Sequence, residues 1–233
     1  MTPYTLLLFL TAVLPGLLIC WYIYRMDKYE REAPLPLVVT FLLGAAITYP
    51  VLKIETWASG FAWLEQGGLL VTVFSSFVIV SFTEEGVKYL ALLAYPFRSA
   101  FFNEPMDGIV YAVMIGMGFA TLENVLYATQ FGMETTLLRA FTAVPAHAAF
   151  AVIMGYFCGR AKFANTLAGQ RRWLWAGFIA PLAIHGVYDF FILQEAYDRL
   201  VILALVVLGA SLILARELLI LQQENSPFRE EEE

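Results

Sequence analysis

Seven long apolar segments divide the chain, and they restrict the folds that it can adopt. Each is close to or above the roughly 20 residues that an α-helix needs to cross about 30 Å of hydrocarbon. Because backbone polar groups inside a bilayer must be paired within the protein, such segments cross as helices. The sequence therefore predicts an all-α fold, a polytopic bundle of transmembrane helices. The expected spans are 4–24, 35–54, 69–95, 106–130, 139–159, 173–193 and 199–220.

The composition agrees with this class of protein. Hydrophobic residues make up 60% of the 233 residues and charged residues 15%, whereas a soluble domain is about half apolar and a quarter charged. No internal repeat or linker divides the chain, so we expect one transmembrane domain, 1–222, followed by a short, disordered, acidic tail in the cytoplasm, 223–233. No basic patch with interleaved aromatic residues suggests nucleic-acid binding. Membrane lipid is the expected surrounding.

The distribution of Lys and Arg predicts the orientation of the bundle. The first segment lacks the basic start and cleavage site of a signal peptide, so we expect it to be retained as a span. With the N-terminus outside, ten of the fourteen Lys and Arg residues fall in inner loops and the tail, three in outer loops, and Lys88 inside a span. We therefore expect an outer N-terminus and a cytoplasmic C-terminus. The long third span is expected to be tilted, or broken at Gly86.

Eight polar residues fall inside the apolar spans, where lipid makes them costly. They are Glu84, Glu85 and Lys88 on the third span, Glu123 and Asn124 on the fourth, His147 on the fifth, and His185 and Asp189 on the sixth. Ionisable groups at this depth mark a functional site by default. Structural ion pairs or hydrogen bonds between helices are the alternative. Two histidines and four carboxylates spread over four spans favour function.

Helical spacing groups several of these side chains. Glu84 and Glu85 lie four and three residues before Lys88, so either can pair with the lysine and leave the other free for chemistry. His185 and Asp189, in HGVYD, are four residues apart on one helix face. They suit two metal ligands, or one ligand and its orienting carboxylate. Counted at about 1.5 Å per residue, the polar groups converge in the middle-to-outer half of the membrane.

Two histidines and several carboxylates around a wet cavity are typical of zinc chemistry. A catalytic zinc takes about three protein ligands and a water. No HExxH motif is present, so the ligands would come from several helices: His147, His185 and a carboxylate, with Glu123 predicted ahead of Glu84 or Asp189. The free glutamate of the third span would then act as general base. Without metal, a Glu–His pair could activate water directly.

Four ordered blocks resemble the conserved blocks of the PrsW family of intramembrane proteases. They are FTEEGVKYLAL, DGIVYAVMIGMGFATLENVLY, RAFTAVPAHAAFAVIMGYFCGRAKF and IHGVYDFF. The resemblance extends to PGLLICWYIYRMDKYEREAP and so covers nearly the whole chain. More distantly, the family is similar to CAAX-prenyl and bacteriocin-processing membrane proteases, whose second motif reads FxxxH. Here Phe119 to Glu123 reads FxxxE, so the two active sites are not assumed to be identical.

The resemblance implies a specific role in the bacterial cytoplasmic membrane. PrsW-like metalloproteases make the first, extracytoplasmic cut in a single-pass, membrane-anchored anti-sigma factor, and a sigma factor of the envelope stress response is eventually released. The Glu-Glu motif and the late histidine of the family correspond to Glu84, Glu85 and His185, which are the expected catalytic residues. The expected supporting residues are Lys88, Glu123, Asn124 and Asp189.

Two other functions fit parts of the sequence. Buried carboxylates and histidines also build proton relays, so an ion or proton transporter is one alternative. It predicts flux without cleavage, and the inverted repeats common in transporters are not visible. A non-catalytic scaffold that binds an anti-sigma factor is the other alternative. The intact EExxK motif and both histidines count against it.

Overall fold

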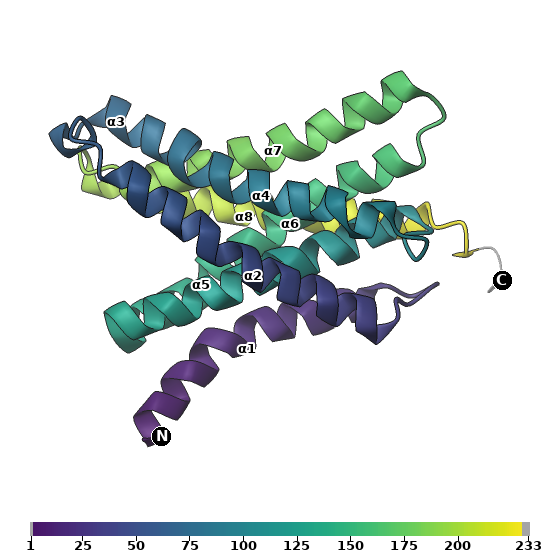
Figure 1. Ribbon diagram of the computed structural model, residues 1–233, viewed down its shortest axis with the longest axis horizontal. Helices are drawn as coiled ribbons and strands as arrows, with labels where there is room; N and C mark the ends of the chain where they lie inside the picture. The colour runs from purple at the N-terminus through teal and green to yellow at the C-terminus, as the bar shows by residue number, and fades with distance from the viewer. Residues whose placement is uncertain (1, 230–233) are drawn as a thin grey trace.

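The computed structural model describes residues 2–229 and is helical throughout, with no strand among these residues (Figure 1). The expected all-α fold is confirmed. The longer elements are α1 (Pro3–Met26), α2 (Pro34–Ser59), α3 (Leu69–Phe74), the π-helical turn η2 (Ser75–Ser81), α4 (Phe82–Ala94), α5 (Pro105–Phe141), α6 (Ala143–Lys162), α7 (Leu167–Leu193) and α8 (Val201–Glu224). Short 3₁₀ turns, η1 (Leu64–Gln66), η3 (Pro96–Arg98) and η4 (Asp198–Leu200), lie between them.

Six helical segments of the described chain are long and apolar enough to cross a membrane. One of them, Pro105–Lys162, contains both α5 and α6. The chain reverses direction at Gly132 within α5, so that Arg139 in the last turn of α5 reaches back to Glu123. The first part of α5 therefore packs antiparallel to α6, and Gly108 near the start of α5 meets Gly155 near the end of α6. Counting α5 and α6 separately gives the seven expected spans. The termini lie at opposite ends of the bundle (Figure 1), as an odd number of crossings requires, and the orientation stays a prediction.

Several helix boundaries differ from those expected. The helix α5 continues past residue 130 to Phe141, because Gly132, with φ 78°, kinks it without ending it. The predicted break at Gly86 is wrong, since this glycine lies inside the regular helix α4. A single glycine weakens a helix by about 1 kcal/mol, which packing readily overcomes. The irregular part of the third span is the π-helical turn η2 instead.

The C-terminal region is helical further than the sequence suggested. The helix α8 runs to Glu224, beyond the expected domain boundary at 222. Ser226 then donates a hydrogen bond to Glu104 at the start of α5. The acidic residues 230–233 lie outside the described residues, so the disorder expected for them stays a prediction.

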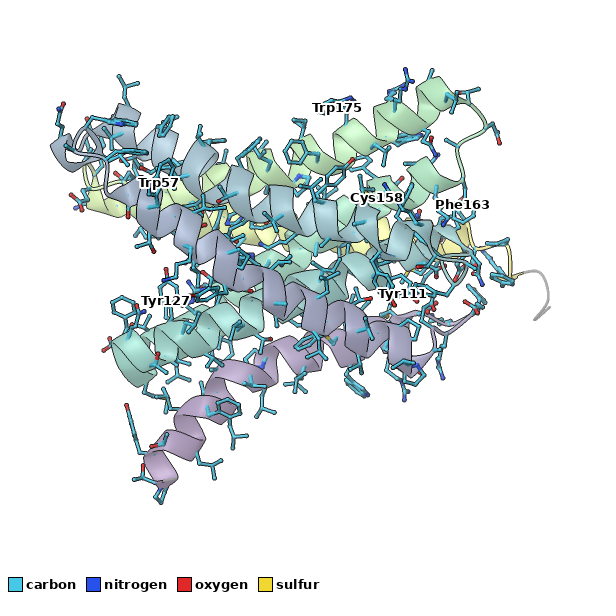
Figure 2. The ribbon with its side chains drawn as sticks, viewed as in Figure 1. Trp57, Tyr111, Tyr127, Cys158, Phe163 and Trp175 are labelled. Atoms are coloured by element: carbon cyan, nitrogen blue, oxygen red, sulfur yellow. The ribbon has the colours of Figure 1, made fainter. Side chains whose placement is uncertain are left out.

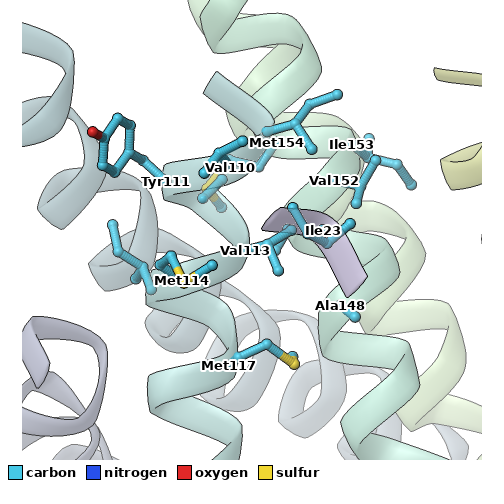
Figure 3. Close-up of a cluster of buried hydrophobic side chains, with 14 of the residues drawn as sticks. Ile23, Val110, Tyr111, Val113, Met114, Met117, Ala148, Val152, Ile153 and Met154 are labelled. Carbon is cyan, nitrogen blue, oxygen red and sulfur yellow. The ribbon is translucent and has the colours of Figure 1, made fainter. Parts of the chain in front are cut away.

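The hairpin of α5 and α6 forms the centre of the bundle, and the other helices surround it. Its buried side chains include Val110, Val113 and Met117 of α5 and Val152 of α6, against which Ile23 of α1 packs (Figure 3). The outer helices carry exposed apolar side chains. Trp57 and Trp175, for example, point away from the bundle (Figure 2). An apolar outer surface of this kind is what a bilayer covers.

Glycines let the central hairpin approach its neighbours closely. A Cβ atom added at Gly118 would lie 1.9 Å from the carbonyl oxygen of Phe41 in α2, and one added at Gly155 would lie 2.3 Å from the carbonyl oxygen of Gly108. The backbones themselves are therefore in contact, as is common where membrane helices pack through small residues.

We predict that Gly118→Ala destabilises the bundle while Gly209→Ala does not. A methyl group at residue 118 collides with the backbone of α2, and overpacking of this kind costs roughly 1–3 kcal/mol. No atom lies within 4 Å of a Cβ added at Gly209. Thermal unfolding of both purified variants in the same detergent provides the measurement. Equal melting temperatures for the two variants would contradict the close contact of α2 with α5.

Candidate active site

The glutamate pair 84–85 opens helix α4, directly after the π-helical turn η2. This turn is held against α7 by two close contacts. A Cβ added at Gly186 would lie 2.4 Å from Cδ1 of Phe77, and the Ser81 hydroxyl donates to the carbonyl oxygen of Leu182 at 2.5 Å. Turns of the π type occur often at functional sites. Here the turn brings the glutamate pair beside the histidine of α7.

Lys88 joins the two glutamates. Its Nζ atom donates to Oε2 of Glu84 at 2.8 Å and to Oε1 of Glu85 at 2.9 Å, and it lies 4.0 Å from the ring centre of Phe119. All three charged side chains are almost wholly buried. The expectation that one glutamate would be left without the lysine is therefore wrong. A single ammonium group has three N–H donors and can serve both carboxylates.

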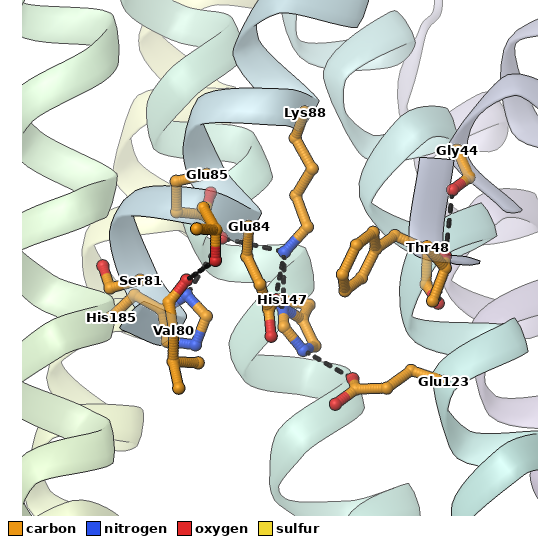
Figure 4. Close-up of polar contacts among 12 residues, drawn as sticks. Gly44, Thr48, Val80, Ser81, Glu84, Glu85, Lys88, Glu123, His147 and His185 are labelled. Atoms are coloured by element: carbon orange, nitrogen blue, oxygen red, sulfur yellow. Dashed lines mark hydrogen bonds and ion pairs between the residues drawn. The ribbon is translucent and has the colours of Figure 1, made fainter. Parts of the chain in front are cut away.

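Both histidines meet this ion pair from other helices (Figure 4). Nδ1 of His185 lies 3.0 Å from Oε1 of Glu85, and its Nε2 lies 3.1 Å from Oδ2 of Asp189. Nδ1 of His147 lies 3.2 Å from Nζ of Lys88. The two imidazole centroids are 5.3 Å apart. Asp189 thus takes the orienting place that its spacing from His185 suggested.

Glu123 and Asn124 do not join the centre of the cluster. Oε2 of Glu123 lies 3.2 Å from Nε2 of His147, on the side of the ring away from Lys88. The amide of Asn124 donates to the carbonyl oxygen of Ala12 in α1 at 3.1 Å, so this side chain joins two helices. Adjacent side chains of an α-helix point about 100° apart, which explains why Glu123 faces His147 while Asn124 faces α1.

Sequence reasoning missed Arg139, which it placed in an outer loop. The residue lies in the last turn of α5, where its Nη2 atom is 2.7 Å from Oε2 of Glu123 and its Cζ atom is 3.9 Å from the ring centre of Tyr127. A straight helix would separate residues 123 and 139 by roughly 24 Å. The kink at Gly132 brings them together. The glycine in QFGMET was the only feature of the sequence that could have indicated this bend.

Glu55 was missed for a different reason. The second span was expected to end at residue 54, but α2 continues to Ser59 and carries Glu55 toward the cluster. Oε1 of Glu55 accepts a hydrogen bond from the Thr83 hydroxyl at 3.3 Å. The sequence could have indicated this residue, because Glu55 follows the expected end of the second span by only one position.

A cavity of about 150 Å³ opens beside the cluster. Its polar lining consists of Glu55, Glu84, Glu123, Tyr127, Arg139, His147, His185, Tyr188 and Asp189. Since a water molecule occupies about 30 Å³ of liquid, the cavity has room for water. A groove of about 580 Å³ adjoins it and shares Glu55, Val80 and Tyr127 with the cavity. The cluster is therefore accessible from a second, larger space between α2, η2 and α5.

The donor atoms that converge most closely could hold a metal ion. One atom each from Glu84, Glu85, His147 and His185 lies within 4.8 Å of the other three. Glu123, which was predicted as a ligand together with His147 and His185, is not part of this group, and the ligand set stays a prediction. Two imidazoles with carboxylates fit zinc by ligand type. Because Lys88 already contacts both glutamates, an ion held by this group would have to take over at least one of those contacts.

Comparison with known proteins links this chain to one family. The model of the PrsW family intramembrane metalloproteases matches residues 32–215. A relative from Geobacillus kaustophilus (strain HTA426), named Protease PrsW, is 38% identical over 185 residues, which cover 79% of each chain. Proteins of the same name from Clostridioides difficile (strain 630) and Bacillus subtilis (strain 168) are 34% and 35% identical. These matches cover 85% and 77% of this chain and 84% and 79% of the two relatives.

No solved structure matches the chain. The family model nevertheless spans α2 to α7 and most of α8, and it includes every residue of the cluster. Glu84, Glu85 and His185, which the resemblance marked as catalytic, lie close together in the structure, and their roles stay predictions. The chain is a multi-pass membrane protein and a member of the PrsW family of intramembrane metalloproteases.

Proposed function

We propose that this protease makes the first cut in a single-pass, membrane-anchored anti-sigma factor and so starts the release of a sigma factor. The observation that carries the proposal is the convergence of Glu84, Glu85, His147 and His185, from α4, α6 and α7, beside one water-sized cavity. The resemblance of the four sequence blocks supplies the substrate class. A transporter needs none of this arrangement, and membership of a protease family argues against it.

Glu84 is the better candidate for the general base. It lines the cavity, whereas Glu85 does not and instead lies between Lys88 and His185. In the proposed reaction the carboxylate of Glu84 takes a proton from water, and the water oxygen attacks the peptide carbonyl carbon. The C–N bond then breaks, and the proton held by Glu84 passes to the leaving amine. The ammonium group of Lys88, 2.8 Å from Oε2 of Glu84, holds this carboxylate in place.

Glu85 and Asp189 orient His185 through its two ring nitrogens. His147, His185 and Glu85 are the residues that would hold a metal ion. When bound, a divalent metal polarises the peptide carbonyl and makes water more acidic. The ion pair of Glu123 with Arg139 stands behind His147 and fixes its ring. In this proposal the polar residues of the site have three roles: reaction with water, binding of the metal ion and orientation of the histidines.

The position of the site suits a cut near one membrane surface. His147 lies about one turn after the start of α6, and His185 about two turns before the end of α7. The end of α7 lies at the end of the bundle where α1 begins (Figure 1). With the predicted orientation, this end is extracytoplasmic. The adjoining groove has apolar walls from Leu52, Ile79 and Phe131, which suit a segment of a membrane-anchored substrate.

We predict that Glu84→Gln lowers the cleavage rate by about 10²–10⁴, because losing a general base typically has this effect. The assay is gel analysis of a candidate anti-sigma factor reconstituted with the protease in vesicles. Glu134→Gln is the matched control, since Glu134 is an exposed acid on α5 that lines neither space. Normal cutting by Glu84→Gln, at equal expression, would remove Glu84 from the role of base.

We predict that a membrane-permeant chelator stops cleavage and that added zinc restores it. Neutral imidazoles are required for ligation, so metal content should fall as the pH is lowered. His147→Ala and His185→Ala should each lower bound metal, measured by mass spectrometry, as well as activity.

A different outcome would separate the metal from the reaction. Full activity in metal-free protein, with both histidine variants inactive, would show that a Glu–His pair activates water without metal. The substrate proposal would then stand, and the zinc assignment would be wrong.

A further inference from the structure

A second group of carboxylates lies at the other end of the bundle, away from the active site. We call it the acidic cluster, and it consists of Asp27, Glu30, Glu32, Glu104 and Asp107. The first three belong to the loop between α1 and α2, and the last two to the start of α5. One carboxylate oxygen each from Glu30, Glu104 and Asp107 lies within 4.8 Å of the other two. Such crowding of like charges requires a compensating group.

No basic side chain supplies that compensation among the described residues. No Lys or Arg nitrogen there forms an ion pair with the acidic cluster. The nearby basic groups bind elsewhere. Nε of Arg31 donates to the backbone carbonyl of Asp27 at 3.3 Å, and Nζ of Lys162 donates to the carbonyl oxygen of Ser99 at 3.2 Å. Four of the five acids, Asp27, Glu32, Glu104 and Asp107, are nevertheless at least 96% buried.

Several buried oxygens in the acidic cluster have no partner. Oδ2 of Asp107 accepts from the backbone N–H groups of Asn103 and Glu104, at 2.6 and 2.9 Å, and so caps α5. Its other oxygen, Oδ1, has no hydrogen-bond partner. The same holds for one carboxylate oxygen each of Asp27, Glu30 and Glu32. A fixed carboxylate with one free, buried oxygen is a preorganised ligand.

Tyr111 provides a separate sign of an incomplete site. Its side chain is fully buried, and its hydroxyl faces the carboxylate of Glu32 without forming a hydrogen bond of normal geometry. In Figure 2 the residue lies toward the end of the bundle that also carries Phe163. Buried hydroxyl groups almost always find a partner. An unpartnered phenol directed at unpartnered carboxylates indicates room for a ligand.

The loop carboxylates also show the effect of missing compensation. Burial first, and then the neighbouring acids, raise the pKa of Asp27 to about 7. Burial and neighbouring carboxylates likewise raise the pKa values of Glu32 and Glu104. A nearby cation would have the opposite effect. These shifts agree with the geometry.

We propose that the acidic cluster binds one hard divalent cation, Mg²⁺ or Ca²⁺, with Glu30, Glu104 and Asp107 as its central ligands. The donors are all oxygen atoms, which these ions prefer. No imidazole or thiolate is present in the cluster, so it differs in kind from the donor set of the active site.

The position of the cation explains what it would do. It would tie the α1–α2 loop to the start of α5, and the end of α8 meets α5 at the same place. The Gln222 amide donates to the carbonyl oxygen of Pro105 at 2.8 Å, and Ser226 bonds to Glu104. Three segments that are far apart in sequence would thus be joined at one point. Binding of an ion to the folded state alone stabilises that state.

The test is thermal unfolding of the full-length, metal-stripped protein in detergent, with Mg²⁺ or Ca²⁺ added at constant ionic strength. We expect a saturable rise of several degrees in melting temperature and about one bound ion per chain by mass spectrometry. The double variant His147→Ala/His185→Ala should keep this response, because it alters only the other site. The ion that gives the larger rise at equal concentration identifies the preferred cation.

Two charge-neutral variants locate the ion. Glu30→Gln and Asp107→Asn should each abolish the rise or shift its midpoint at least tenfold, and the amide oxygen of Asn can still cap α5. Glu195→Gln, at an exposed acid in the α7–α8 connection, is the matched control and should respond as the original protein does.

Three results would overturn the proposal. The first is no saturable response and no bound ion with either cation, which would mean that protons alone neutralise the acidic cluster. The second is an unchanged response in Glu30→Gln, and the third is a response lost in His147→Ala/His185→Ala.

Discussion

Lys88 allows two adjacent carboxylates to exist in the interior of a membrane protein. Removing a carboxylate or an ammonium from water costs several kcal/mol per ion, even after the protein relaxes. The lysine offsets this for Glu84 and Glu85 together, and its contact with His147 joins the ion pair to α6. Without the ammonium group, two buried carboxylates would share one helical turn with no compensating charge. The placement of the proposed catalytic base therefore depends on this contact.

From Lys88 the network runs in two directions and joins four helices. One branch passes through Glu85 to His185 and Asp189, and the other through His147 to Glu123 and Arg139. Nearly every step pairs an acidic with a basic group, although buried Nε of Arg139 has no hydrogen-bond partner among the described residues. A largely satisfied network of this kind is rigid and fixes helix positions. The same contacts thus hold α4, α5, α6 and α7 together and orient the reactive groups.

Contacts within one helix could be predicted from the sequence, whereas contacts between helices could not. The spacing of Glu84, Lys88, His185 and Asp189 gave both of their intrahelical pairs correctly. Glu85 and His185 are 100 residues apart, and only the packing of η2 on α7 brings them together. The contact of Glu123 with Arg139 could not be predicted either, because it depends on the bend at Gly132. Long apolar segments fix the fold class, but helix ends such as that of α2 follow from tertiary packing.

The two groups of acids solve the same electrostatic problem in different ways. In the active site the compensating charges belong to the chain, since Lys88 and Arg139 each contact a glutamate. In the acidic cluster no basic side chain of the described residues does so, and the compensation must come from outside. A basic side chain is always present, so the active site has its compensating charge in every condition. A bound metal ion is not always present, so the charge balance of the acidic cluster would depend on the ion concentration. Both groups share α5, which carries Asp107 at one end and Glu123 near its middle. Because α5 is in backbone contact with α2 and α6, fixing its first turn restricts how it can move against the helices of the active site.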